Sequence, residues 1–126
     1  MELRSPYAPF SAEFKYHGTV TNGAILPHPD IANVRLTEVL FALSDPIRLD
    51  IVHELAEGPM SMADCGATHP HIPKATKSNV MKVLREAGII RNEPAGRGRV
   101  ISLRREDLDG CFPGLLSAVL DAPHCA

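Results

Sequence analysis

The spacing of hydrophobic and polar positions predicts short amphipathic helices through the first half of this 126-residue chain. Asp30 is a good N-cap, so we expect the first helix to begin directly after it. Apolar residues then recur at spacings of three and four, which is the pattern of one buried helix face. The residues that this pattern assigns to the buried stripe are Leu36, Val39, Leu40 and Leu43.

Two further helix starts are marked by their capping residues. Asp45 followed by Pro46 combines an N-cap with a first-turn proline, and Gly58 ends the helix that this pair begins. Ser61 and Asp64 resemble a capping box, which predicts a short third helix. In the second helix the residues expected to face the core are Leu49, Val52, Leu55 and Ala56.

A longer helix followed by a hairpin is predicted over residues 73–105. Pro73 suits a first helical turn, and Gly88 suits the position just past a helix end. The apolar stripe between them is Val80, Met81, Leu84 and Ala87. Alternating residues on both sides of a turn-rich loop at residues 93–98 predict a two-stranded hairpin.

Charge is concentrated in this same segment. From Lys74 to Arg105 there are nine lysines and arginines and two acids, a local charge of +7 in a chain whose net charge is −2. A helix and hairpin with this charge would attract the phosphates of a nucleic-acid duplex. A solvated, lysine-rich surface helix would show the same run of charge and is the alternative explanation.

Composition limits the other classes of protein. The length predicts one domain, and the sequence has no apolar run of transmembrane length and no signal-peptide pattern, so we expect a cytoplasmic protein without a membrane partner. Three widely spaced cysteines do not form a disulfide framework. Enzymatic motifs such as G-x-S-x-G, H-E-x-x-H or a glycine-rich phosphate loop are absent, which predicts neither an enzyme nor a cofactor.

Three segments resemble the ArsR/SmtB family of bacterial transcriptional repressors. FALSDPIRLDIVHELAEG is similar to the family's second-helix signature with its D-P-x-R-L motif, VLREAGII resembles the end of its recognition helix, and LRREDLDGCFPGLL resembles the tail of one subgroup. The resemblance covers residues 27–121. It implies a mainly α (α+β) winged helix-turn-helix with about five helices and a two-stranded β-hairpin wing, in a domain of residues 30–122.

The same resemblance implies a homodimer that pairs through the first helix and the last helix, here about residues 113–120. Such pairing would place two recognition helices about one helical turn apart on a pseudo-palindromic operator. The expected function is therefore sequence-specific binding of double-stranded DNA by a transcriptional regulator, a repressor. The alternative is a winged helix used as a protein-interaction module without specific DNA binding.

Residues of the basic segment are assigned to DNA by their position in this pattern. We expect the base edges to be read by the first half of the basic helix, through Lys74, Thr76, Ser78 and Asn79. Lys82 and Arg85 are placed for phosphates, and Arg97 and Arg99 for the backbone or a minor groove at the wing tip. Lys77 departs from the family, which has an inward-facing Leu or Val there. Either the helix is rotated, or the lysine stem lies along apolar surface with its ammonium in water.

The sequence leaves the effector open between an ion, an oxidant, a small organic molecule and none. The family's C-x-C arsenic site is replaced by Ser61 and Ala63, so no metal ligands are assigned, and Cys65 is expected to be a small buried hydrophobe. Cys111, just before the last helix, is the candidate redox residue. No metal-ligand role is assigned to three other groups of residues. These are the loop pair His69 and His71, the tail pair His124 and Cys125, and the acids Asp107, Asp109 and Asp121.

The two ends of the chain are expected to lie outside the domain. Residues 1–29 contain four prolines and read as an extended or partly disordered arm, and residues 123–126 read as a tail. Four aromatic residues of the arm would either pin it to the body or a second subunit, or belong to a mobile segment: Tyr7, Phe10, Phe14 and Tyr16.

Overall fold

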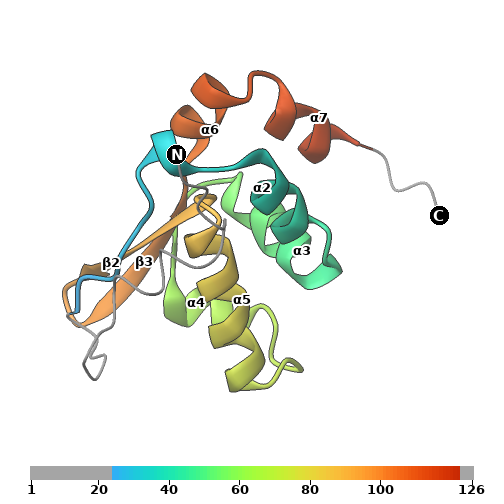
Figure 1. The fold of residues 1–126 in the computed structure, drawn as a ribbon. Coiled ribbons are helices and arrows are strands. Elements are labelled where there is room, and N and C mark those ends of the chain that lie inside the picture. The colour runs from blue at the N-terminus through green and yellow to red at the C-terminus, as the bar shows by residue number, and fades with distance from the viewer. Residues whose placement is uncertain (1–23, 123–126) are drawn as a thin grey trace.

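The computed structural model describes residues 24–122, so the aromatic cluster of the predicted arm and the tail lie outside the described residues. Helices α2 to α5 form the body, the hairpin β2–β3 projects from one side, and α6 and α7 lie across the end opposite α5 (Figure 1). The elements in chain order are η1 (Ile31–Asn33), α2 (Leu36–Leu43), α3 (Pro46–Leu55), β1 (Met60–Ser61), α4 (Met62–Ala67), α5 (Lys74–Glu86), β2 (Ile90–Ala95), β3 (Gly98–Leu103), α6 (Arg105–Cys111) and α7 (Leu115–Asp121). Within the described residues no helix is both long and apolar enough to cross a membrane.

Two of the three helix starts predicted from capping residues are confirmed, those of α3 and α4. The Asp45 carboxylate accepts hydrogen bonds from the backbone N–H groups of Ile47 and Arg48, both at 3.0 Å, and Pro46 begins α3. The Ser61 hydroxyl accepts from the Asp64 N–H at 3.0 Å and caps α4. Asp30 instead caps the short 3-10 turn η1, so the prediction that the first α-helix begins directly after it is wrong.

The buried side of α2 differs from the predicted stripe. Val39 and Leu43 are buried as expected, together with Ala42, whereas Leu36 and Leu40 remain 43% and 46% exposed. The apolar face of this helix is wider than the core of the chain covers, and the spacing of its leucines does not show which edge of that face meets the core. Two of the four residues predicted to be buried, Leu36 and Leu40, therefore do not belong to the core of a single chain.

A third strand extends the predicted hairpin. The sheet has the antiparallel order β1-β3-β2, with Met60 opposite Ile101, and β1 is too short to leave a sequence pattern. The hairpin is also tighter than expected, because Glu93 and Ala95 pair with Val100 and Gly98. The predicted loop at residues 93–98 thus reduces to a two-residue turn at positions 96 and 97.

The last helix, predicted at about residues 113–120, corresponds to α7, and a helix that was not predicted, α6, precedes it. Residues 105–111 form α6, and α7 follows after Gly114, whose φ of +82° is a conformation that glycine adopts at little cost. Leu108 and Leu116 bury one side of each helix against the core. The described residues therefore contain six α-helices, one more than expected.

Gly88 closes α5 and lies against the segment before α2. Its φ is +88°, and a β-carbon at this position would come within 2.4 Å of a methyl carbon of Val34. We expect Gly88→Ala to lower the free energy of unfolding by about 1–2 kcal/mol, because it adds both left-handed strain and a steric overlap. Urea unfolding measures this change. Gly110→Ala is the matched control, since nothing lies near that β-carbon, and an equal loss in both variants would contradict this explanation.

Candidate nucleic-acid interface

The helix α5 separates its apolar and polar residues onto opposite sides. Its predicted apolar stripe is buried, with Val80 and Met81 each 4% exposed and Leu84 fully buried. On the other side most of the α5 residues predicted to contact DNA reach the surface. Lys74, Ser78, Asn79 and Lys82 are exposed, and Thr76 is half-buried.

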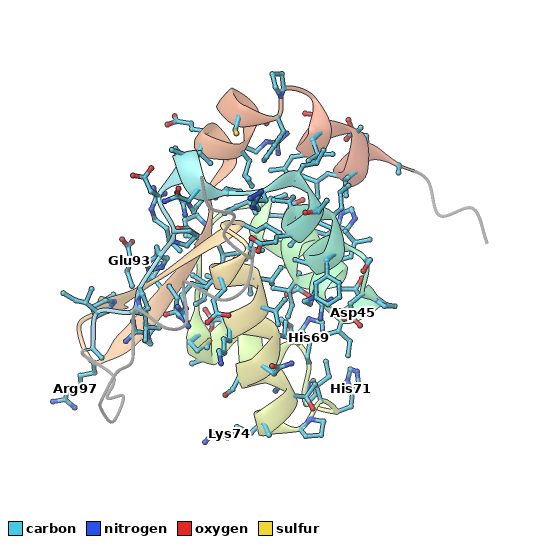
Figure 2. The ribbon with its side chains drawn as sticks, in the orientation of Figure 1. Asp45, His69, His71, Lys74, Glu93 and Arg97 are labelled. Carbon is cyan, nitrogen blue, oxygen red and sulfur yellow. The ribbon has the colours of Figure 1, made fainter. Side chains whose placement is uncertain are left out.

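The wing adds one basic side chain to this side of the molecule. Arg97 occupies the two-residue turn between β2 and β3 and is exposed. Figure 2 shows Lys74 at the outer end of α5 and Arg97 at the wing tip, both directed away from the body and toward the lower part of the view. The helix and the wing tip can therefore face one extended partner together.

Two of the predicted DNA-contacting arginines lie inside the protein. Arg85 is 8% exposed, and its Nη1 donates a hydrogen bond to the Pro27 carbonyl at 2.6 Å. Arg99 is 9% exposed, and its guanidinium donates to the side-chain oxygen of Asn92 at 2.5 Å and to its backbone carbonyl at 3.2 Å. These guanidinium groups hold the chain before η1 and the hairpin. We therefore correct their assignment and leave both out of the interface.

The fold was compared with known proteins. No protein-family model and no curated protein matches the sequence. Among solved structures, an ArsR family transcriptional regulator matches with a TM-score of 0.56 and 22% identity over 65% of this chain and 89% of that chain. The transcriptional repressor BigR from Xylella fastidiosa matches with a TM-score of 0.50 and 27% identity, over 61% and 85%. A possible transcriptional regulator for arsenical resistance matches with a TM-score of 0.53 and 24% identity, over 67% and 84%.

The chain has an ArsR/SmtB-like winged helix fold. In these terms α4 and α5 are the helix-turn-helix, α5 is the recognition helix, and β2 and β3 are the wing.

A short strap before η1 crosses the base of the wing. Besides the bond from Arg85 to Pro27, the Asn92 N–H donates to Nε2 of His28 at 3.0 Å, and Nη1 of the buried Arg104 donates to the Pro29 carbonyl at 2.8 Å. No sequence pattern indicates these contacts, because each joins residues more than fifty positions apart. The strap fixes the wing relative to the recognition helix.

His28 makes the strap sensitive to pH. Burial lowers the pKa of His28 below its usual 6.5, and the nearby Arg85 and Arg104 lower it further, with Glu93 acting in the opposite direction. The unfolded chain therefore binds more protons as pH falls below 6.5, and the stability that is complete above that pH declines. We expect urea midpoints to fall between about pH 7.5 and 5.5, and to fall less in His28→Gln. The exposed His71→Gln is the control, and identical pH profiles for the chain and His28→Gln would contradict this role.

Lys77 faces inward from the recognition helix. Its Nζ donates a hydrogen bond to the Gly66 carbonyl at 2.8 Å, at the C-terminal end of α4. Cys65 lines the same pocket as Lys77, is 2% exposed and is the small buried hydrophobe that was predicted. Burial raises the pKa of the Cys65 thiol and Glu54 raises it further, while Lys77 opposes them. This thiol is poorly suited to act as a nucleophile.

The other candidate metal ligands are not placed around one common point. Nε2 of His69 is 2.7 Å from a carboxylate oxygen of Glu54, and His71 is exposed. Across residues 24–122, no three His, Cys, Asp or Glu side chains are placed to hold a metal ion together. Cys111 is exposed at the end of α6, and the pair at positions 124 and 125 lies outside the described residues.

Proposed function

We propose that the chain is a sequence-specific DNA-binding transcriptional regulator, a repressor that binds an inverted-repeat operator as a homodimer. The observation that carries this proposal is the exposed polar and basic side of α5 beside an exposed basic wing tip. It is supported by the likeness to BigR, which is described as a transcriptional repressor. The regulators among the structural neighbours also favour a protein that is not an enzyme.

The exposed residues divide into two roles. Asn79 can bond adenine through two hydrogen bonds, and the hydroxyl groups of Ser78 and Thr76 accept several partners, so we assign these residues and Lys74 to base edges. Lys82, farther along α5, is assigned to phosphates. Arg97 at the wing tip is assigned to the sugar-phosphate backbone or a minor groove.

The proposed dimer accounts for the apolar surface left on α2. Leu36, Leu40 and Phe41 are 43%, 46% and 54% exposed, which is unusual for three neighbouring large apolar residues on one helix. A second copy packed on α2 and α7 would cover them and fix the distance between the two recognition helices.

The proposed dimer predicts that a charge on the apolar surface of α2 separates the two subunits. Leu40→Glu is expected to convert the chain from twice its 13.7 kDa mass to monomer, because a carboxylate at this position would be buried against the second subunit. Light scattering after size exclusion measures this mass. The exposed Ala63→Glu on α4, outside the proposed α2 and α7 surface, should remain dimeric. A native chain that is monomeric at all concentrations would contradict the proposed interface.

Salt dependence tests the DNA-binding proposal against the protein-interaction alternative. Because phosphate contacts release counterions, affinity for a duplex should fall steeply as salt rises. Weak binding with a shallow dependence would favour a protein partner instead.

Cys111 remains the proposed site of action for an oxidant, if the effector is one. It is exposed and is the last residue of α6, shortly before α7 and the proposed dimer surface. Diamide should then change DNA affinity in the native chain and not in Cys111→Ser. Unchanged affinity after diamide treatment of the native chain would remove the redox role.

A further inference from the structure

A pocket of about 540 Å³ lies between the two helices of the helix-turn-helix. Its wall is largely apolar, formed by Ile51 of α3, Met62 of α4, Ile72 of the connecting loop and Met81 of α5. Sites for small organic molecules in proteins are usually concavities of about 300–1,000 Å³ with an apolar lining and a few placed polar groups. The size and lining of this pocket match that description.

Lys77 supplies a charged group to the pocket. Its half-buried ammonium donates to the Gly66 carbonyl, which leaves donor capacity because an ammonium carries three N–H groups. The carboxylate of Glu54 lies 2.7 Å from Nε2 of the pocket residue His69 and accepts a hydrogen bond from the Thr68 hydroxyl at 3.3 Å. In the part of the chain that the structure describes, no ion pair joins Lys77 to a carboxylate. A positive charge at an apolar cavity without a counter-charge suits an anionic ligand with an apolar body.

We propose that this pocket binds a small amphipathic carboxylate, with its apolar body between Met62 and Met81 and its carboxylate on the ammonium of Lys77. A neutral molecule of the same shape would fill the apolar wall but would leave the charge unmatched. A large polar anion would match the charge and lose contact with the wall. The apolar wall and the charge of Lys77 together therefore disfavour both the neutral molecule and the large polar anion.

The position of the pocket would couple binding of such a ligand to binding of DNA. This coupling rests on the function proposed above. Lys74 and Ser78 line the same pocket and belong to the surface assigned to base edges. A carboxylate bound at Lys77 would draw Lys74 toward it and would alter the spacing of α4 and α5. The ligand and DNA therefore oppose one another, and by linkage each weakens the affinity of the protein for the other.

Methionine methyl resonances test the binding site on the full chain without DNA. The chain has four methionines, of which Met62 and Met81 line the pocket while Met60 lies in β1 and Met1 in the undescribed arm. Octanoate is the probe, and it should shift the methyl signals of Met62 and Met81 in a saturable way. Octanol, its neutral counterpart, should bind about tenfold more weakly, since it lacks a charge-assisted hydrogen bond. Equal affinity for the two probes, no saturable shift, or shifts at Met1 and Met60 alone would overturn the proposal.

A charge-removing variant separates Lys77 from general apolar binding. Lys77→Gln should reduce octanoate affinity about tenfold to the level of octanol, whereas the exposed Arg35→Gln should not change it. The comparison of octanoate with octanol on the native chain decides the proposal even where Lys77→Gln folds poorly. Unchanged octanoate affinity in a folded Lys77→Gln would overturn it.

A DNA titration then tests the link to regulation. Saturating octanoate should weaken duplex binding about tenfold, and octanol at the same occupancy should have a smaller effect. Octanoate binding with unaltered DNA affinity would overturn the regulatory link. A chain that binds octanoate and no DNA would refute the proposed function while the ligand site stands, so the two failures are distinguishable.

Discussion

Arg104→Met is expected to lower the free energy of unfolding by about 2–3 kcal/mol, because it removes a buried guanidinium together with its hydrogen bond and its ion pair. The Arg104 side chain is 5% exposed, donates to the Pro29 carbonyl at 2.8 Å, and lies 3.0 Å from a carboxylate oxygen of Asp107. Among residues 24–122, its removal would leave Asp107 paired with the partly exposed Arg91 alone, and it would remove the bond that holds the strap at Pro29. Urea unfolding measures the loss.

The neighbouring arginine provides a matched control. Arg105 is 41% exposed and lies 3.6 Å from Asp109, which is itself 45% exposed. Exposed ion pairs contribute little, so Arg105→Met should change the free energy of unfolding by less than about 1 kcal/mol. Similar losses in the two variants would mean that burial of Arg104 does not stabilise the strap.

Asn79→Ala is expected to reduce discrimination between a matched and a scrambled duplex by about 1–3 kcal/mol, whereas Lys82→Ala should weaken both duplexes alike. The difference follows from the proposed roles, since a base contact carries sequence information and a phosphate contact does not. Lys82→Ala should also reduce the salt slope by about one. Fluorescence anisotropy titrations over a range of salt concentrations measure both quantities.

The control for these titrations is Arg35→Ala, an exposed arginine outside the proposed surface. It should leave affinity and discrimination unchanged. A Lys82→Ala chain with unaltered affinity for the scrambled duplex would refute the phosphate role, and an Asn79→Ala chain with full discrimination would refute the base contact.

Sequence reasoning succeeded where structure is decided by neighbouring residues. The caps formed by Asp45 and Ser61 depend on contacts within one turn of the same helix, and the buried stripe of α5 follows from the helical spacing of its own apolar residues. The order of the helix-turn-helix and wing also followed, because helical spacing, a glycine stop and strand alternation occur in that order along the chain.

The errors concern residues whose environment is set by distant segments. Arg85 and Arg99 have the chemistry of phosphate ligands, and only the folded chain shows that Pro27 and Asn92 take their guanidinium groups. The sequence allowed two explanations for Lys77 at an inward-facing position of the helix. Its hydrogen bond to the Gly66 carbonyl depends on how α4 packs against α5. The sequence could not show the exposed side of Leu40, since an apolar residue gives the same pattern toward a core or a second subunit.

The most direct test of the central claim is selection of bound duplexes from a random pool, with the affinity of the enriched sequences followed against salt. A homodimer that places α5 in successive major grooves should enrich an inverted repeat with half-sites about one helical turn apart, and affinity should fall steeply with salt. No enriched sequence, together with weak binding and a shallow salt dependence, would contradict the proposal that the exposed side of α5 and the wing tip read an operator.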